Sequence, residues 1–179
     1  MNNITKTQAS LTLAAVAMLT GAANASLIGD TITAEILIGG SAVATNIETV
    51  LDGPEGNGNW LGFVGYNVQS DTIQVFSAIE DPTFTWSGGI SVSFSDLNFS
   101  TGETIIGAEI IDQGGNGMSD LTMADLSWTG DSLSINLDAL NGFDARLAQT
   151  VTVRLLTVPT PGALSLLGLG ALPMMRRRR

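Results

Sequence analysis

Apolar and polar residues alternate along much of the chain between residues 30 and 158. The alternation is most regular over residues 90–95, 133–137 and 151–155, where every second residue is apolar. A period of two is typical of a β-strand that buries one face and exposes the other. Less regular strands are predicted over residues 32–38, 43–50, 60–68, 72–79, 104–111 and 121–129.

Turn-forming motifs separate these segments. Asp-Gly-Pro at residues 52–54, Gly-Asn-Gly-Asn at residues 56–59 and Thr-Gly-Asp at residues 129–131 all lie beside predicted strands, and these residue types favour tight turns. No helical period of 3.6 extends over ten or more residues here, and only residues 139–147 allow a short helical turn. The pattern predicts an all-β fold, an antiparallel β-sandwich of jelly-roll-like or immunoglobulin-like form.

The composition narrows the chemistry that this domain can perform. The chain of 179 residues has no cysteine and no histidine, which excludes disulfides, thiol nucleophiles, Ser-His-Asp triads and the usual zinc sites. A two-carboxylate glycosidase is the enzyme class left open. The neighbours Glu80 and Asp81 would point to opposite faces of a strand and form no such pair. We therefore expect a protein that is not an enzyme.

The charge is strongly negative and unevenly distributed. The whole chain has 17 acidic and seven basic residues, a formal charge of −10. Residues 26–158 hold all 17 acids and two arginines, so their formal charge is −15. Such a surface repels nucleic acid, and mutual repulsion keeps exported chains soluble and apart. No nucleic-acid partner is expected.

The first 25 residues have the features of a signal peptide. Residues 11–19 are an apolar run of nine, too short to span a bilayer and typical of a signal core. Ala23 and Ala25 take the −3 and −1 positions of an A-x-A motif, which predicts cleavage by signal peptidase after Ala25. An ordinary amphipathic first helix is the alternative, but the segment is apolar on all faces. We predict export.

The C-terminal residues form a second targeting segment. Pro159 and Pro161 end the last predicted strand, because proline fixes φ and lacks a backbone donor. Residues 162–175 carry no charge; as a helix they would rise about 21 Å against roughly 30 Å of hydrocarbon, a marginal span. The positive-inside rule places the following arginines in the cytoplasm and the acidic domain outside. These arginines are Arg176, Arg177, Arg178 and Arg179.

The order Val-Pro-x-Pro, leucine–glycine segment and terminal arginine cluster resembles the PEP-CTERM sorting signal of bacterial surface proteins. Pro159-Thr160-Pro161 stands here in place of the usual Pro-Glu-Pro, and Pro173 would bend the end of the helix. The resemblance implies recognition by an exosortase, a membrane protease-transpeptidase that removes the tail and transfers the chain to the outer surface. It also implies a link to exopolysaccharide and biofilm.

The predicted organisation has three parts. Residues 1–25 are a signal peptide with a helical core, residues 26–158 an acidic β-sandwich domain, and residues 159–179 a sorting signal with a short apolar helix. The chain is expected to be anchored in the inner membrane before processing, and to lie on the cell surface or in the extracellular matrix afterwards. A plain single-span anchor that keeps its tail is the alternative.

One loop has residues suited to a cation. Asp112, Asn116 and Asp120 supply oxygen ligands of the kind that calcium prefers. The loop departs from an EF-hand, since its third position is Gly114 and its twelfth is Met123. An ordinary flexible loop is the alternative, and no cofactor other than calcium is predicted.

Four aromatic residues are candidates for stacking on a sugar ring, although residues of this kind also build sandwich cores. We expect a non-enzymatic bacterial surface or matrix protein with a structural or adhesive role in exopolysaccharide. A carbohydrate-binding module, with or without calcium, is the alternative. The four aromatic residues are Trp60, Tyr66, Trp86 and Trp128.

Overall fold

A computed structural model of the chain describes residues 25–53, 57–60, 62, 64–77, 85–86, 89–114, 121–137, 143–144 and 150–159. Almost all regular structure in these residues is β-strand. The strands are β1 (Thr31–Ile38), β2 (Ser41–Thr49), β3 (Asn57–Trp60), β4 (Val64–Val68), β5 (Thr72–Ser77), β6 (Thr85–Trp86), β7 (Ile90–Ser95), β8 (Glu103–Gly114), β9 (Leu126–Trp128), β10 (Leu133–Asn136), β11 (Phe143–Asp144) and β12 (Thr150–Pro159).

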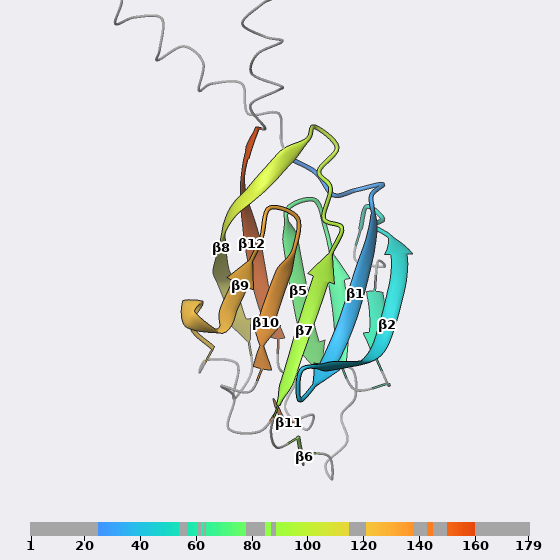
Figure 1. Cartoon of the computed structure of the whole chain (residues 1–179), viewed down its shortest axis with the longest axis vertical. Helices are drawn as coiled ribbons and strands as arrows, with labels where there is room; N and C mark the ends of the chain where they lie inside the picture. The colour runs from blue at the N-terminus through green and yellow to red at the C-terminus, as the bar shows by residue number, and fades with distance from the viewer. Residues whose placement is uncertain are drawn as a thin grey trace, which may run out of the picture.

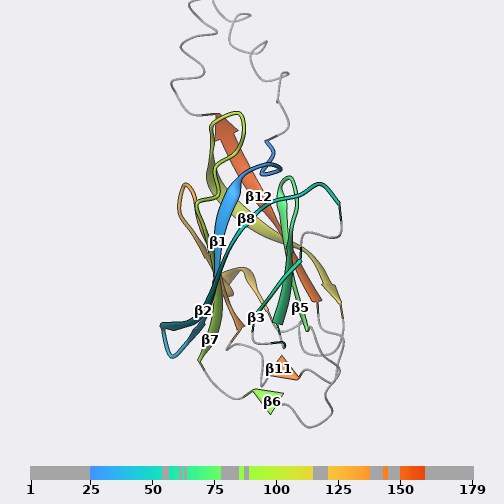
Figure 2. The same ribbon diagram turned by 90° about the vertical axis from the view of Figure 1, so that its right-hand side faces the viewer.

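The chain forms two five-stranded sheets, and these face each other, as Figures 1 and 2 show from the front and from the side. The strand order is β2-β1-β7-β10-β9 in the first sheet and β3-β4-β5-β12-β8 in the second, while β6 and β11 form a separate pair. Every pair of neighbouring strands is antiparallel. The predicted all-β antiparallel sandwich is confirmed at this level. The signal helix and the C-terminal helix lie outside the described residues.

The strand predictions differ from the structure in several places, and the turn predicted at residues 56–59 lies largely in β3. Residues 60–68 were expected as one strand but belong to the hairpin of β3 and β4, where Gly62 has a φ of +79° that suits a turn. Within residues 121–129, Met123–Asp125 form a 3₁₀ turn capped by Thr122 before β9 begins. Within residues 139–147, Phe143–Asp144 are a strand, and the rest of that range lies outside the described residues.

The core between the sheets is centred on three aromatic rings. The ring centroid of Trp60 lies 4.2 Å from that of Tyr66 and 5.8 Å from that of Phe94. The Trp60 indole donates a hydrogen bond of 3.2 Å to the carbonyl of Ala34, which satisfies its buried N–H. A Cβ on Gly58 would lie 1.8 Å from Tyr66 Cζ, so glycine at this position makes room for the tyrosine ring.

Both ends of the described chain lie at the same pole of the sandwich (Figure 1). The Ser100 amide donates to the Ser26 carbonyl at 3.0 Å, and Pro159 pairs with Glu103 at the end of β12. One short stretch of chain therefore contacts both ends. This pole is the upper one in Figures 1 and 2.

Candidate functional site

The predicted calcium ligands are described only in part. Asp112 is exposed on the edge strand β8, opposite Thr152 of β12, whereas Asn116 and Asp120 lie outside the described residues. Where side chains are described, no three acidic groups come close enough to share a metal ion. Calcium binding by this loop stays a prediction.

The four candidate stacking residues occupy different environments. Trp60 and Tyr66 are 1% and 0% exposed and pack against each other, so their ring faces are occupied by the core. Trp128 is 39% exposed at the end of the edge strand β9. Trp86 lies in β6, and its side chain is not among those described. Trp60 and Tyr66 are therefore core residues, as in the alternative to sugar stacking.

The two targeting segments border the described fold. Ala25 is half-buried and packs against the core, and Pro159 is the last residue of β12. Within the described ranges, no helix has the length and hydropathy needed to cross a membrane. Outside those ranges lie Ala23, Thr160, Pro161, Arg176, Arg177, Arg178 and Arg179.

A polar cluster that the sequence did not predict lies where the edge strands β2 and β3 meet. The Asn46 amide donates to the Tyr66 hydroxyl at 3.1 Å, and this hydroxyl is also hydrogen-bonded to the Glu48 carboxyl. The three side chains satisfy the polar end of a tyrosine whose ring belongs to the core.

Burial governs the protonation of this cluster. It raises the pKa of the Glu48 carboxyl above its ordinary value, and the hydrogen bond with Tyr66 offsets part of the rise. It also raises the pKa of the Tyr66 hydroxyl, with the Asn46 bond acting against the rise and the Glu48 charge adding to it. Tyr66 therefore keeps its proton at neutral pH. The partner of Glu48 is a core tyrosine, whereas a glycosidase site needs a second carboxyl.

The outer face of the first sheet carries a polar row that crosses all five strands. Its members are mainly short hydroxyl side chains, and the Thr45 hydroxyl donates to the Glu35 carboxylate at 3.1 Å. Their outward direction follows from the alternation of each strand, since residues on either side of Glu35 are buried in the core. We call this set the hydroxyl row: Thr45, Glu35, Ser93, Ser134 and Ser127.

The outer face of the second sheet carries a row in the corresponding place, with longer amide side chains. The Gln74 amide donates to the Thr152 hydroxyl at 3.4 Å. Asn57 is placed by its register alone, since its side chain is not described. We call this set the amide row: Asn57, Asn67, Gln74, Thr152 and Asp112.

Asn67 is the unusual member of the amide row. It is 5% exposed, although its neighbours Tyr66 and Val68 fill the core and direct it to the outer face. Its Oδ1 atom is buried and accepts no hydrogen bond from any residue that the structure describes. Most buried polar atoms in native proteins have a hydrogen-bond partner. Asn67 Oδ1 is therefore an exception among the described residues.

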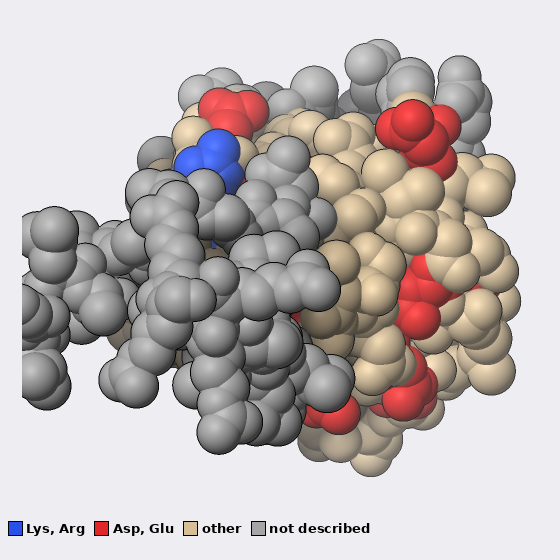
Figure 3. Space-filling model, turned by 90° about the horizontal axis from the view of Figure 1, so that it is seen from above, with Lys and Arg blue, Asp and Glu red and all other residues tan. Residues whose placement is uncertain are grey.

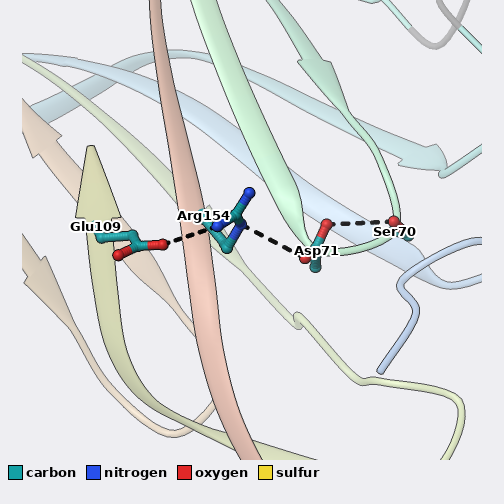
Figure 4. Close-up of polar contacts among 4 residues, drawn as sticks. All are labelled: Ser70, Asp71, Glu109 and Arg154. Carbon is teal, nitrogen blue, oxygen red and sulfur yellow. Dashed lines mark hydrogen bonds and ion pairs between the residues drawn. The ribbon is translucent and has the colours of Figure 1, made fainter. Parts of the chain in front are cut away.

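An ion-pair network lies beside the amide row. The Arg154 guanidinium is 3.0 Å from a Glu109 carboxylate oxygen and 3.9 Å from one of Asp71, which also contacts Ser70 (Figure 4). These side chains of the two ion pairs are about half exposed, so the pairs add little stability. Their main effect is that two carboxylates already neutralise this arginine.

An open hollow of about 440 Å³ lies at the pole where the chain ends emerge, lined in part by Leu97, Phe99, Glu103 and Asp131. Each of the two carboxylates accepts a hydrogen bond from a threonine hydroxyl of its own turn. Figure 3 looks onto this pole and shows the visible acidic side chains in separate patches. Among the described lining residues there is no basic side chain, and the two carboxylates are each bound within their own turn.

No protein-family model, no curated protein and no solved structure matches this chain. The candidate sites therefore rest on the chain's own geometry. Of these, the polar cluster stabilises the core and the ion pairs neutralise one another. The amide row alone combines a continuous set of donors and acceptors with a buried acceptor that no described residue satisfies.

Proposed function

We propose that the chain is an exported, non-enzymatic protein of a bacterial surface or extracellular matrix, with a structural or adhesive role. The observation that carries the proposal is the position of the chain ends. Ser26 follows the predicted signal cleavage site and Pro159 begins the predicted sorting signal, and both lie at one pole. A chain attached through that pole presents the outer faces of both sheets to its surroundings.

The tail has the character of a temporary anchor. Its apolar stretch, residues 162–175, is shorter than a typical span and is interrupted by Gly168, Gly170 and Pro173. It would hold the chain briefly in the membrane while an exosortase-type protease acts near Pro159 and Pro161. The resemblance to PEP-CTERM signals supports this order of events.

The connections between strands support a jelly-roll-like form of the sandwich. From β5 onward the chain alternates between the sheets, with β7 in the first, β8 in the second, β9 and β10 in the first and β12 in the second. The first strand β1 pairs with β7, and β5 pairs with β12. Pairing between strands that are far apart in the sequence is typical of the Greek-key connections of jelly rolls.

Intact-mass measurement of the protein from its host's surface tests the proposal. The expected mass corresponds to a chain that begins near Ser26 and ends near Pro159–Pro161, with or without an added group. Replacing all four terminal arginines with serine should leave unprocessed precursor, while the control Arg154→Ser should be processed normally. A surface form that retains Arg179 would contradict the proposal and support a permanent anchor.

A further inference from the structure

The buried oxygen of Asn67 needs a donor from outside the described protein. An unsatisfied buried acceptor is destabilising, and Gln74, the row neighbour of Asn67 whose side chain is described, does not relieve it. Gln74 directs its amide to Thr152 instead, and no described residue donates to Asn67 Oδ1. A ligand hydroxyl that donates to this oxygen would recover the lost hydrogen bond.

An aromatic ring lies next to the amide row. A Cβ on Gly65 would be 2.4 Å from Phe76 Cε2, so the Phe76 ring covers the backbone of β4 at the residue pair beside Asn67 and Gln74. Phe76 is half-buried and belongs to the outer face, because its neighbour Val75 is in the core. Apolar C–H groups pack well against such a ring.

The charges around the row favour an uncharged ligand. Asn67, Gln74 and Thr152 are neutral groups, and amides and hydroxyls donate and accept as sugar hydroxyls do. Arg154, the described cation nearest the row, already contacts two carboxylates. An acidic polymer would meet the repulsion of a domain with a formal charge of −15.

From these observations we infer that the outer face of the second sheet binds a neutral polysaccharide chain along the amide row. The Asn67 oxygen is covered in the free protein, so the side chain turns outward on binding and accepts a hydrogen bond from a sugar hydroxyl. Gln74 and Thr152 hold neighbouring hydroxyls, and Phe76 packs on the apolar side of a ring. Strands are spaced about 4.8 Å apart, so the row across five strands is roughly 19 Å long, room for several sugar units. The inference deepens the proposed adhesive role and rests on it.

Affinity electrophoresis of the full chain in mild detergent tests this site. Gels would contain hydroxyethyl cellulose or galactomannan as neutral polymers and alginate as the acidic one. The test variant is Gln74→Ala with Thr152→Ala, and the control is Ser93→Ala with Ser134→Ala in the hydroxyl row. We expect at least one neutral polymer to retard the wild type and the control. The test variant should bind at least tenfold more weakly, and Phe76→Ala should weaken binding by itself.

Three results would overturn the inference. They are retardation by neither neutral polymer, retardation by alginate alone, and equal loss of binding in the test and control variants. Equal melting temperatures for the two double variants would show that lost binding is not lost folding. Intact-mass data answer the separate question of processing: a processed chain that binds no neutral polymer contradicts this inference alone, and a binding chain that keeps its tail contradicts the proposed processing alone.

Discussion

The two outer faces of the sandwich carry polar rows in corresponding places, and the rows differ in how their polar atoms are satisfied. The hydroxyl row consists mostly of short serine and threonine side chains that water can reach. The amide row has longer side chains, and its member Asn67 is 5% exposed, with an oxygen that accepts no hydrogen bond from the residues that the structure describes. Both rows cross five strands and both include one carboxylate, Glu35 or Asp112.

The difference separates a solvated surface from a candidate binding surface. Polar side chains on an exposed sheet face need only water, and their alternation with core residues explains the hydroxyl row completely. A buried acceptor that no described residue satisfies, such as Asn67 Oδ1, lowers stability. Proteins tolerate a local loss of stability at functional sites more than elsewhere. For this reason we infer that the polysaccharide binds at the amide row and not at the hydroxyl row.

The largest predicted effect comes from the core that both faces share. In Gly58→Ala the new Cβ would collide with the buried Tyr66 ring, and overpacking of a fixed core typically costs about 1–3 kcal/mol or more. The matched control is Gly114→Ala, also on an edge strand, where the Cβ would lie 3.8 Å from Thr150 Cβ. Urea unfolding should show a large loss for the first variant and little change for the second. If Gly58→Ala lost as little unfolding free energy as Gly114→Ala, the Tyr66 ring would be free to move away from the new Cβ.

A pair of asparagines sharpens the comparison further. Asn46 donates to the Tyr66 hydroxyl, so Asn46→Ala should lower the free energy of unfolding by about 1 kcal/mol. Asn67→Ala removes a buried oxygen that no described residue satisfies, together with some buried packing. These effects oppose each other, so stability should fall less than in Asn46→Ala, while polysaccharide binding should weaken. Urea unfolding with affinity electrophoresis measures both. A loss of stability in Asn67→Ala as large as that in Asn46→Ala would show that Asn67 is a structural residue.

The Glu48 cluster predicts a smaller, pH-dependent effect. Because burial raises the folded-state pKa of Glu48 above its ordinary value, its contribution to stability is fully present below the ordinary value of 4.5 and is lost as pH rises through the raised pKa. Glu48→Gln, which resembles the protonated acid, should raise the Tm slightly at pH 7 and not at pH 4. Glu35→Gln on the outer face is the control. A Tm difference that is the same at both pH values would contradict the assignment.

The smallest effect is predicted at the ion pairs that border the amide row. Arg154→Gln removes two half-exposed pairs, so it should cost at most about 1 kcal/mol at low salt. The difference from wild type should shrink in 1 M salt, where charges are screened within about 3 Å. Binding of the neutral polymers should persist. Complete loss of binding in Arg154→Gln would indicate an ionic ligand. It would contradict the inference that the neutral side chains of the amide row bind the polymer.

Much of the fold follows from local alternation. Ile90–Ser95 alternate without interruption, and the structure has a strand with these bounds. The hairpin of β3 and β4 was harder to predict, because Trp60, Val64 and Tyr66 are all apolar and hide the turn around Gly62. The two-residue strands β6 and β11 stabilise each other through pairing, which no local pattern reveals.

The amide row could not have been predicted from the sequence. Asn67 and Gln74 are seven positions apart, but Thr152 and Asp112 join them only through the pairing of β12 with β5 and β8. Register between distant strands depends on the whole sandwich. A partial signal existed, since Tyr66 and Val68 flank Asn67 and alternation directs it outward. The same alternation places Tyr66 in the core, away from a sugar-stacking platform.

The most direct test of the central claim is nuclear magnetic resonance of the side-chain amides of the full chain during titration with cellohexaose and mannohexaose. We predict that the Asn67 and Gln74 amide resonances shift with saturable dependence on at least one oligosaccharide. The Asn46 amide, which is engaged with Tyr66, should stay in place, as should the backbone amides of Ser93 and Ser134. Shifts confined to the hydroxyl row, or none at Asn67 and Gln74 with either oligosaccharide, would contradict the account.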